Sequence, residues 1–374
     1  MTQATGRGMG GMGSSDGTEI SAEELAALLG TQHAPFLLDV REPEEFESWA
    51  ISGAANVPLS SLEHRLTQVA RDRQVVVVCA SGQRSAQAAG ALRSAGIDAS
   101  NLLGGMLAWS AVYDTVRLDV GAFSVVQVRR RSKGCLSYVV GSGGEALVVD
   151  PSSEIDRYRD LAAAEGWQIT HVLDTHVHAD HVSGARALAA ATGSALHLST
   201  ADALRYGVEA LAERDRILLG TTSVDVLATP GHTMGSVVVD LGGGAMLTGD
   251  TLFVDGVGRP DLADAAREYA EALHHSLVSL LDGRSDDVLV LPAHFGAGVT
   301  VVRDEPVAAT LGAVRAAVPQ LGWERERFVS WASTRATPRP PSYVEIVRLN
   351  VGETWASADE VRALEVGPNR CGTG

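Results

Sequence analysis

The chain has 374 residues, of which 45% are hydrophobic and 20% charged, and its formal net charge at pH 7 is −16. This length predicts two domains, and the composition is typical of a soluble globular protein and excludes an intrinsically disordered one. The acidic balance argues against a nucleic-acid partner, because nucleic-acid binders usually carry a basic surface.

The sequence gives no sign of a membrane or a secreted location. No apolar run approaches the roughly 18 residues needed to cross a bilayer, and the segment 1–17 lacks the apolar core of a secretory signal, so we expect a flexible leader there. The cysteines, Cys79, Cys135 and Cys371, are far apart and odd in number, which fits a reducing compartment. We therefore expect a cytoplasmic protein without a membrane partner. The oligomeric state stays open, and a homodimer is compatible with the sequence.

Residues 18–113 predict an α/β domain with a parallel sheet, because short apolar strands alternate with helical stretches. Strands are predicted at 35–40 and 74–78, and helices at 42–49 and 85–94. The run QVVVV at 74–78 is almost purely β-branched, which is typical of a central parallel strand.

The predicted strand at 74–78 is followed by CASGQRS, which places Cys79 where a strand gives way to a helix. The amide N–H groups that follow, the helix N-terminus and the charge of Arg84 all favour a thiolate at Cys79. Gly82 lets this loop close tightly without a Cβ clash. The pattern predicts a nucleophilic cysteine.

This loop resembles that of a single rhodanese domain, and so do DVREPEEF at 39–46, GAANVPL at 53–59 and LGGMLAW at 103–109. The resemblance covers residues 18–113. It implies that Cys79 carries sulfane sulfur as a persulfide and that Arg84 steers an anionic donor such as thiosulfate. The loop residues implied to surround the substrate are Ser81, Gly82, Gln83 and Ser85.

The helical pattern lapses at 114–122, where we expect a linker, and a second domain with a C-terminal tail is predicted over 123–374. Gly-rich turns between strands at 125–128, 136–140 and 146–150 predict an antiparallel meander. Later strands, predicted at 171–174, 224–228, 236–241 and 288–291, end at or just before His or Asp residues. The second domain is therefore predicted to be a layered α/β structure whose strand ends converge on one place.

The segment THVHADHVSG at 175–184 and the later motifs TPGHT, LTGDT and LPAH predict a metal site, because each places His or Asp after an apolar strand. The candidate ligands are His176, His178, Asp180, His181, His232, Asp250 and His294. Asp150, which ends the strand LVVD, is a candidate for orienting a liganding imidazole. Cys135 lies on a predicted strand, and we expect it to be packed rather than reactive.

These segments, from about residue 123 to 294, resemble the metallo-β-lactamase superfold, which implies an αββα sandwich with a metal site at one edge between the sheets. In its dinuclear hydrolases, one ion would be held by His176, His178 and His232, the other by Asp180, His181 and His294, with Asp250 bridging them and a hydroxide attacking a thioester or amide. In its persulfide dioxygenases, one Fe(II) per chain would be held by His176, His232 and Asp250. The ligands alone leave Zn(II) or a dinuclear site open.

Features outside the ligand cluster favour the dioxygenase branch. The segments GDTLFVDGVGRPDL at 249–262, KGCLSY at 133–138 and RPPSYVEIVRLNVG at 339–352 resemble that branch. Arg259, within the first of them, either stabilises an anionic substrate or pairs with Asp261. Both interpretations remain open at this point.

The two resemblances predict a protein of sulfane-sulfur metabolism. We expect Fe(II)-dependent oxidation of a low-molecular-weight thiol persulfide, such as glutathione persulfide, by O2 to sulfite and thiol, joined to sulfur transfer through a Cys79 persulfide with thiosulfate or sulfite as partner. One alternative is a hydroxyacyl-thiol thioester hydrolase, similar to hydroxyacylglutathione hydrolases, with a dinuclear site. Another is a sulfur carrier or persulfide sensor whose metal is only structural.

Overall fold

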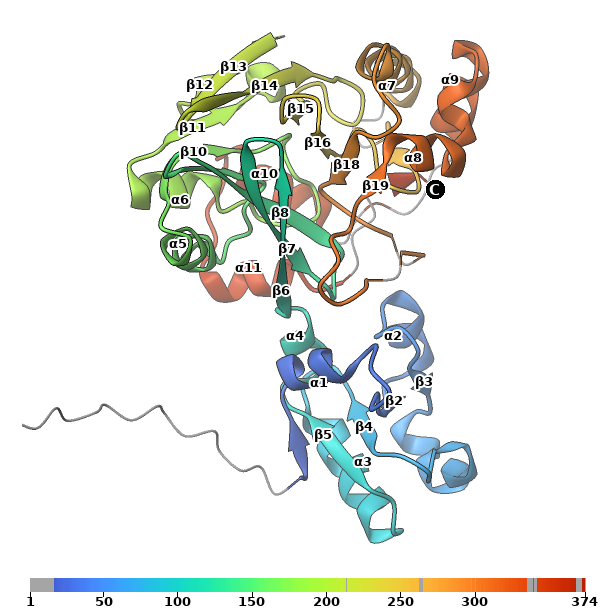
Figure 1. Ribbon diagram of the computed structural model, residues 1–374. Helices are drawn as coiled ribbons and strands as arrows, with labels where there is room; N and C mark the ends of the chain where they lie inside the picture. Colours follow the sequence, from blue (N-terminus) through green and yellow to red (C-terminus); the bar gives the residue numbers. More distant parts are fainter. Residues whose placement is uncertain are drawn as a thin grey trace, which may run out of the picture. The chain divides into compact units, whose positions relative to one another are not determined.

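The computed structural model describes residues 17–212, 214–261, 265–296, 298–299, 301–334, 339 and 342–367, and the backbone of 372–373 (Figure 1). The predicted leader up to residue 16, Cys371, and residues 262 and 340–341 of the motifs above lie outside the described residues. The chain divides into two compact units, Met1–Val112 and Tyr113–Gly374. Within the described ranges, no helix has the length and apolar character needed to span a membrane.

The first unit is built on a five-stranded sheet of order β1-β5-β4-β2-β3 in which every pairing is parallel. Its strands are β1 (Glu19–Ile20), β2 (Phe36–Asp39), β3 (Ala55–Asn56), β4 (Val75–Val78) and β5 (Ala99–Leu102). Its helices are α1 (Ala22–Leu28), α2 (Pro43–Ser48), the 3-10 segment η1 (Leu59–Gln68), α3 (Gln83–Ser94) and α4 (Gly105–Trp109). The predicted parallel sheet is confirmed.

Strand β4 is the centre of this unit and is buried on both faces. Val75 and Val77 pack with Leu92 of α3, whereas Val76 and Val78 pack against Leu25 of α1 on the other face. Side chains alternate across a strand, so a run of β-branched residues can fill two helix-covered faces at once.

The second unit contains two large sheets. The first has the order β12-β11-β10-β9-β8-β7-β6, and the second has the order β13-β14-β15-β16-β18-β19. The strands of the first are β6 (Tyr113–Val120), β7 (Phe123–Arg130), β8 (Cys135–Ser142), β9 (Glu145–Val149), β10 (Gln168–Leu173), β11 (Ala195–Leu198) and β12 (Glu209–Ala210). Those of the second are β13 (Arg214–Leu219), β14 (Thr222–Ala228), β15 (Val237–Asp240), β16 (Ala245–Gly249), β18 (Leu289–Pro292) and β19 (Ala309–Thr310). A short pair is formed by β17 (Val257–Gly258) and β20 (Gly372–Thr373).

Helices cover the outer face of each sheet (Figure 1). The helical segments of this unit are α5 (Ile155–Ala164), α6 (Ala185–Thr192), η2 (Thr200–Asp202), α7 (Ala266–Leu281), α8 (Leu311–Ala317), η3 (Pro319–Gly322), α9 (Arg325–Thr334), α10 (Tyr343–Asn350) and α11 (Ala358–Leu364). Of these, α5 and α6 pack on the first sheet, and α7, α8 and α9 pack on the second. Leu147 and Val239 lie in the core between the sheets, whereas the adjacent Val148 and Val238 face the helices. The predicted αββα sandwich is therefore confirmed.

The predicted linker at 114–122 is wrong, because strand β6 occupies most of it. All eight residues of β6 pair with β7 in antiparallel register. Val116 and Val120 are buried, while Arg117 and Asp119 are exposed. Strand β6 is an edge strand with one solvated face, and the charged residues on that face interrupt the apolar run. A prediction based on continuous apolar runs therefore does not detect it. The predicted antiparallel meander that follows, formed by β7, β8 and β9, is confirmed.

Candidate active sites

Cys79 lies directly after β4, one turn before α3, where the sequence placed it. Its side chain is buried, and its Sγ accepts hydrogen bonds from the Gly82 N–H at 3.1 Å and the Ser85 hydroxyl at 3.2 Å. Burial alone would raise the pKa of this thiol, but these donors and the amide N–H groups of Ser81 and Ser85 lower it below its ordinary value. The loop therefore stabilises a thiolate, which is the reactive form.

The loop closes because glycines allow the backbone to come close. Gly82 has a φ of +92°. A Cβ added to Gly105 would lie 2.2 Å from the Cys79 carbonyl oxygen, so no other residue fits there without a shift. The Met106 N–H donates to that same carbonyl at 2.8 Å. The motif LGGMLAW thus supports the cysteine loop from behind, while Ser81 and Gln83 are exposed.

Arg84 is held by an acidic residue that the sequence analysis did not single out. Its guanidinium donates to both carboxylate oxygens of Glu45 at 2.8 Å, and this pair is partly exposed. Hydrogen bonds from Arg84 lower the pKa of Glu45 to about 2. Glu45 lies within the motif DVREPEEF, which was the available signal. A role for Arg84 toward an anionic donor stays a prediction, and it would compete with this pairing.

In the second unit, His176, His232 and Asp250 converge from the ends of β10, β14 and β16. The Asp250 Oδ2 lies 3.6 Å from His176 Nε2 and 3.4 Å from His232 Nε2, and all three side chains are buried. Each of these three atoms lacks a hydrogen-bond partner among the described residues. Buried polar atoms are rarely left unpaired, so three that face one another fit a site that binds a cation.

The hydrogen bonds around this triad prepare both imidazoles to bind a metal. The Nδ1–H of His176 donates to the Thr175 hydroxyl at 3.0 Å, which in turn donates to Asp150 at 2.9 Å. The Nδ1–H of His232 donates to the Arg259 carbonyl at 2.9 Å. Each bond puts the proton on Nδ1 and leaves a lone pair on Nε2. Burial lowers the pKa of both imidazoles, which keeps them neutral.

The carboxylate of the triad is also suited to a cation. Asp250 is buried, and although burial raises its pKa, the neighbouring His294 and His176 lower it below the usual range. Gly258 brings β17 against the site, because a Cβ there would lie 1.9 Å from the Asp250 carbonyl oxygen. The three residues therefore fit a metal held by two imidazoles and one carboxylate, a set that suits non-haem Fe(II).

His178 and Asp150 form a separate group with Asp174. His178 Nε2 lies 3.1 Å from Asp150 Oδ1 and 3.8 Å from Asp174 Oδ1, and Asp150 also accepts from the Thr175 N–H. Burial raises the pKa of Asp174 to about 6. Asp150 thus contacts the segment that carries the triad imidazole. The sequence analysis missed Asp174, although it directly follows β10 and begins the approach to the histidine-rich segment.

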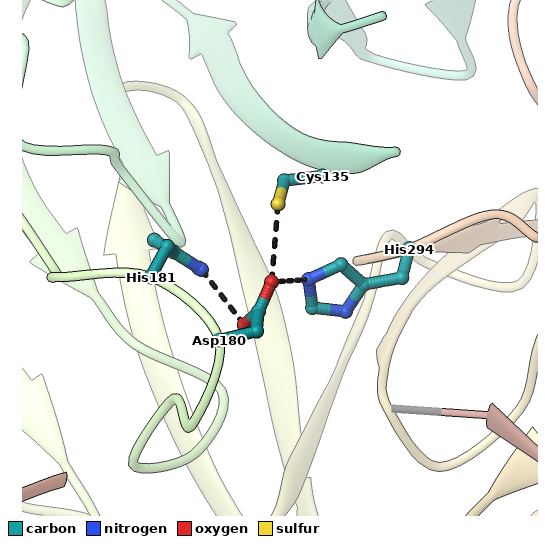
Figure 2. Close-up of side chains that lie close together, drawn as sticks. All are labelled: Cys135, Asp180, His181 and His294. Atoms are coloured by element: carbon teal, nitrogen blue, oxygen red, sulfur yellow. Dashed lines mark hydrogen bonds and ion pairs between the residues drawn. The ribbon is translucent and has the colours of Figure 1, made fainter. Parts of the chain in front are cut away.

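The remaining candidates, Asp180, His181 and His294, gather with Cys135 (Figure 2). Cys135 is buried, and its thiol contacts the Asp180 carboxylate. Arg259 is fully buried and pairs with Asp261, its Nε and Nη2 each 2.7 Å from a carboxylate oxygen. This is the pairing that the sequence analysis considered as one of two interpretations.

Two residues from the C-terminal part of the chain hold the histidine-rich segment in place. The Asn350 amide donates to the carbonyls of His178 and His181 at 2.8 and 2.9 Å. The Glu365 carboxylate accepts from the Val182 N–H at 2.7 Å and pairs with Arg130 at 2.6 Å. Asn350 lies within the segment 339–352 that the sequence analysis quoted for its resemblance, but its contacts could not be predicted because its partners lie far away in the chain. No motif of the sequence analysis contained Glu365.

Comparisons with known proteins agree with this architecture. Residues 21–112 match the family described as Rhodanese-like domain, and residues 131–294 match the Metallo-beta-lactamase superfamily. Hydroxyacylglutathione hydrolase of Anaeromyxobacter dehalogenans is 42% identical over 35% of this chain and 51% of its own length. Persulfide dioxygenase ETHE1 of Bos taurus is 30% identical over 56% of this chain and 80% of its own length.

The chain spans about half the length of the curated hydroxyacylglutathione hydrolases that it matches. Among solved structures, ETHE1 from Myxococcus xanthus is 31% identical, with a TM-score of 0.54. That similarity covers 60% of this chain and 96% of the Myxococcus chain.

Proposed function

The chain belongs to the metallo-beta-lactamase superfamily and carries a rhodanese-like domain ahead of that fold, and from this premise we propose that it oxidises a low-molecular-weight thiol persulfide with O2. Water is the third reactant and supplies the third oxygen of sulfite. The products are sulfite, the free thiol and two protons, so the sulfane sulfur is oxidised while dioxygen is reduced. The reaction needs no external reductant. The rhodanese-like domain exchanges sulfane sulfur through a persulfide on Cys79.

One observation carries the dioxygenase proposal. The unpaired atoms His176 Nε2, His232 Nε2 and Asp250 Oδ2 are buried and face one another. Two imidazoles and one carboxylate leave open coordination positions, whereas a closed site would fill them with protein ligands. When bound, Fe(II) would supply adjacent positions for a persulfide sulfur and dioxygen.

The chain's own residues set up this site in three ways. The Thr175 hydroxyl and the Arg259 carbonyl fix the protonation of the two imidazoles. The Asp250 carboxylate stays ionised because His294, which donates to it, lowers its pKa. Arg259, whose carbonyl contacts His232, also carries a buried guanidinium that pairs with Asp261. We propose that this guanidinium attracts the anionic persulfide.

In the rhodanese-like domain, the Cys79 thiolate attacks the sulfane sulfur of thiosulfate. The sulfur–sulfur bond of thiosulfate breaks, sulfite leaves with its electron pair, and a persulfide forms on Cys79. The N–H of Gly82 and the hydroxyl of Ser85, which contact Sγ, lie where they can donate to the persulfide. Transfer to a thiol, or back to sulfite, reverses these bond changes.

The test is an oxygen-electrode measurement on the anaerobically purified full chain loaded with Fe(II), with glutathione persulfide as substrate. We expect O2 uptake matched by sulfite and glutathione, and about one iron per chain. The matched control is the His232→Ala variant, which removes one triad ligand. O2 uptake that is equal in the wild type and in this variant would contradict the proposal.

A thioester hydrolase is the second candidate, and two observations favour it. The hydrolase relatives show the higher identities over shorter stretches, and four more ligand-type side chains lie beside the triad. A hydroxyacyl-glutathione thioester assayed on the same preparation separates the two functions. Thioester cleavage with no O2 uptake would establish the hydrolase and overturn the dioxygenase.

A further inference from the structure

A carboxylate outside the ligand set contacts both histidine-bearing segments of the triad. Asp202 ends η2 and is partly buried. Its Oδ2 accepts from the Thr233 hydroxyl at 3.0 Å, and Thr233 directly follows the triad ligand His232. The Val177 N–H donates to the same carboxylate, and Val177 directly follows His176. One side chain therefore connects the segments that carry the two imidazoles.

The backbone around Asp202 is arranged for this contact. The Gly235 N–H donates to Asp202 Oδ1 at 3.1 Å. A Cβ added to Gly235 would lie 2.3 Å from Asp202 Oδ2, so a larger residue there would displace the carboxylate. Ala203, directly after Asp202, has a φ of +53°, a left-handed conformation that residues other than glycine rarely adopt. Strained backbone of this kind gathers at functional sites, which indicates a role for the residue that it presents.

The groups around Asp202 suit an ionised carboxylate. The Thr233 hydroxyl and the N–H groups of Gly235 and Val177 all donate to it. Burial raises the pKa of Asp202, and these donors and the nearby His232 oppose that rise. An asparagine in its place would have the same size, but it would offer one acceptor oxygen instead of two and carry no charge. Asp202 therefore brings a negative charge close to a triad imidazole.

We propose that Asp202 is a positioning residue for the triad: it holds the His176 and His232 segments together and places a negative charge that lowers the reduction potential of iron bound there. The first effect raises metal affinity, because the imidazoles are already in place when the ion binds. The second effect follows because Fe(III) carries one more positive charge than Fe(II), so a nearby anion stabilises it more. The inference rests on the iron centre of the proposed function, and Asp202 acts through Val177 and Thr233 rather than as a ligand.

The first test measures the affinity of the metal-free full chain for Fe(II) without air, by competition with a chelator. His232→Ala, which lacks a triad ligand, identifies the equivalent that binds at the triad. Asp202→Asn should weaken the binding of that equivalent about 10–100-fold, the usual contribution of an orienting partner outside the ligand set. Thr233→Val should also weaken it, because one hydrogen bond is lost, whereas Thr233→Ser keeps the hydroxyl and should keep most of the affinity. The matched control is Asp287→Asn, which removes the same charge from an exposed position of the same unit.

The second test measures the effect of the charge. A redox titration of the iron-loaded full chain, without persulfide or O2 and followed by the EPR signal of Fe(III), gives the reduction potential. Asp202→Asn should have a higher potential than the wild type, because the anion that stabilises Fe(III) is gone. Thr233→Val keeps the Asp202 carboxylate and should stay close to the wild type, as should Asp287→Asn. A purely structural role of Asp202 would not separate Asp202→Asn from Thr233→Val in this way.

A second variant keeps the test decisive if Asp202→Asn does not fold. Asp202→Ser removes the charge but keeps a hydroxyl that can accept a hydrogen bond, and it should show the same two changes. Wild-type affinity in the folded variant, a potential no higher than that of the wild type, or equal changes in Asp287→Asn would overturn the proposal. Because no turnover is measured, these failures are distinct from a failure of O2 uptake. A wild-type chain that binds no Fe(II) would overturn the iron centre and this inference together.

Discussion

The two candidate sites of this chain are built in opposite ways. Around Cys79, the groups that stabilise the sulfur all come from the next six residues, and three of them are backbone N–H groups, those of Ser81, Gly82 and Ser85. Around the triad, the ligands come from the ends of β10, β14 and β16, and Asn350 and Glu365 hold the segment between β10 and α6 from far along the chain.

This difference predicts how each site responds to change. When one loop forms the whole site, the electrostatic effects on the thiol are local. Substitutions in the loop should therefore change the pKa of Cys79 without affecting the rest of the fold. A site assembled from strand ends depends on tertiary packing, so residues remote from the metal can weaken it. The comparison also predicts that the two sites work independently.

The largest expected effect is the complete loss of one activity when the nucleophile of one site or a metal ligand of the other is replaced. Cys79→Ser should abolish thiosulfate-dependent sulfur transfer, because no thiolate remains, while O2 uptake with glutathione persulfide persists. His232→Ala should abolish O2 uptake and leave sulfur transfer intact, because it removes one of the three metal ligands. Sulfur transfer is measured as thiocyanate formed from cyanide. If either folded variant lost both activities, independence would be wrong.

The next largest effect is expected from Asn350, which lies far along the chain from the histidine-rich segment and holds it by hydrogen bonds. Asn350→Ala should lower metal affinity about 10–100-fold, because orienting partners outside the ligand set typically contribute that much. It should also lower the free energy of unfolding of the second unit by about 1–3 kcal/mol, since it leaves the His178 and His181 carbonyls unpaired. Competition with a chelator and chemical unfolding measure the two quantities.

The control for this prediction is Val344→Ala. Val344 lies on the same helix, α10, but is exposed. It should leave metal affinity, unfolding and sulfur transfer unchanged. An Asn350→Ala protein with wild-type metal affinity would show that the triad does not depend on the C-terminal part of the chain.

The same contrast explains what could be predicted from the sequence. The Cys79 loop could be placed because strand, loop and helix are consecutive, and the triad because each ligand follows an apolar strand. Cys135 was expected only to be packed, since its partners Asp180 and His294 meet it through sheet pairing that no local pattern reveals. Asn350, Glu365 and strand β6 were missed for related reasons: long-range contacts and a charged solvated face leave no local apolar signal.

A smaller effect is expected inside the cysteine loop. Ser85→Ala removes one hydrogen bond to Sγ and should raise the pKa of Cys79 toward its ordinary value. Alkylation by iodoacetamide at neutral pH should slow by about tenfold, because a hydrogen bond to a charged group contributes about 1.5 kcal/mol at the lower end of its range. The pH at which half of the maximal alkylation rate is reached should move upward.

Ser94→Ala is the matched control, since Ser94 lies at the far end of the same helix and bonds to the Gly90 carbonyl. Its alkylation profile should equal that of the wild type. A profile for Ser85→Ala that does not move would mean that backbone N–H groups alone stabilise the thiolate. Metal affinity should be the same in all three proteins, as the comparison of the two sites requires.

The smallest effect is expected at the Glu45–Arg84 pair beside the loop. Glu45→Gln should lower the free energy of unfolding at pH 7 by less than about 1 kcal/mol, because the pair is partly exposed. The folded-state pKa of Glu45 is about 2, below its ordinary value, so its contribution is present at neutral pH and is lost as the pH falls toward 2. Denaturant unfolding at several pH values, with Glu44→Gln as control, measures this.

The same substitution tests whether Arg84 attracts the sulfur donor. Without Glu45, the guanidinium loses its bidentate partner and becomes available to an anion at the mouth of the loop. The KM for thiosulfate should then fall by up to about fivefold, the factor that corresponds to about 1 kcal/mol, and the effect should weaken with added salt. A higher KM would instead mean that Glu45 holds Arg84 in the position in which it binds the donor.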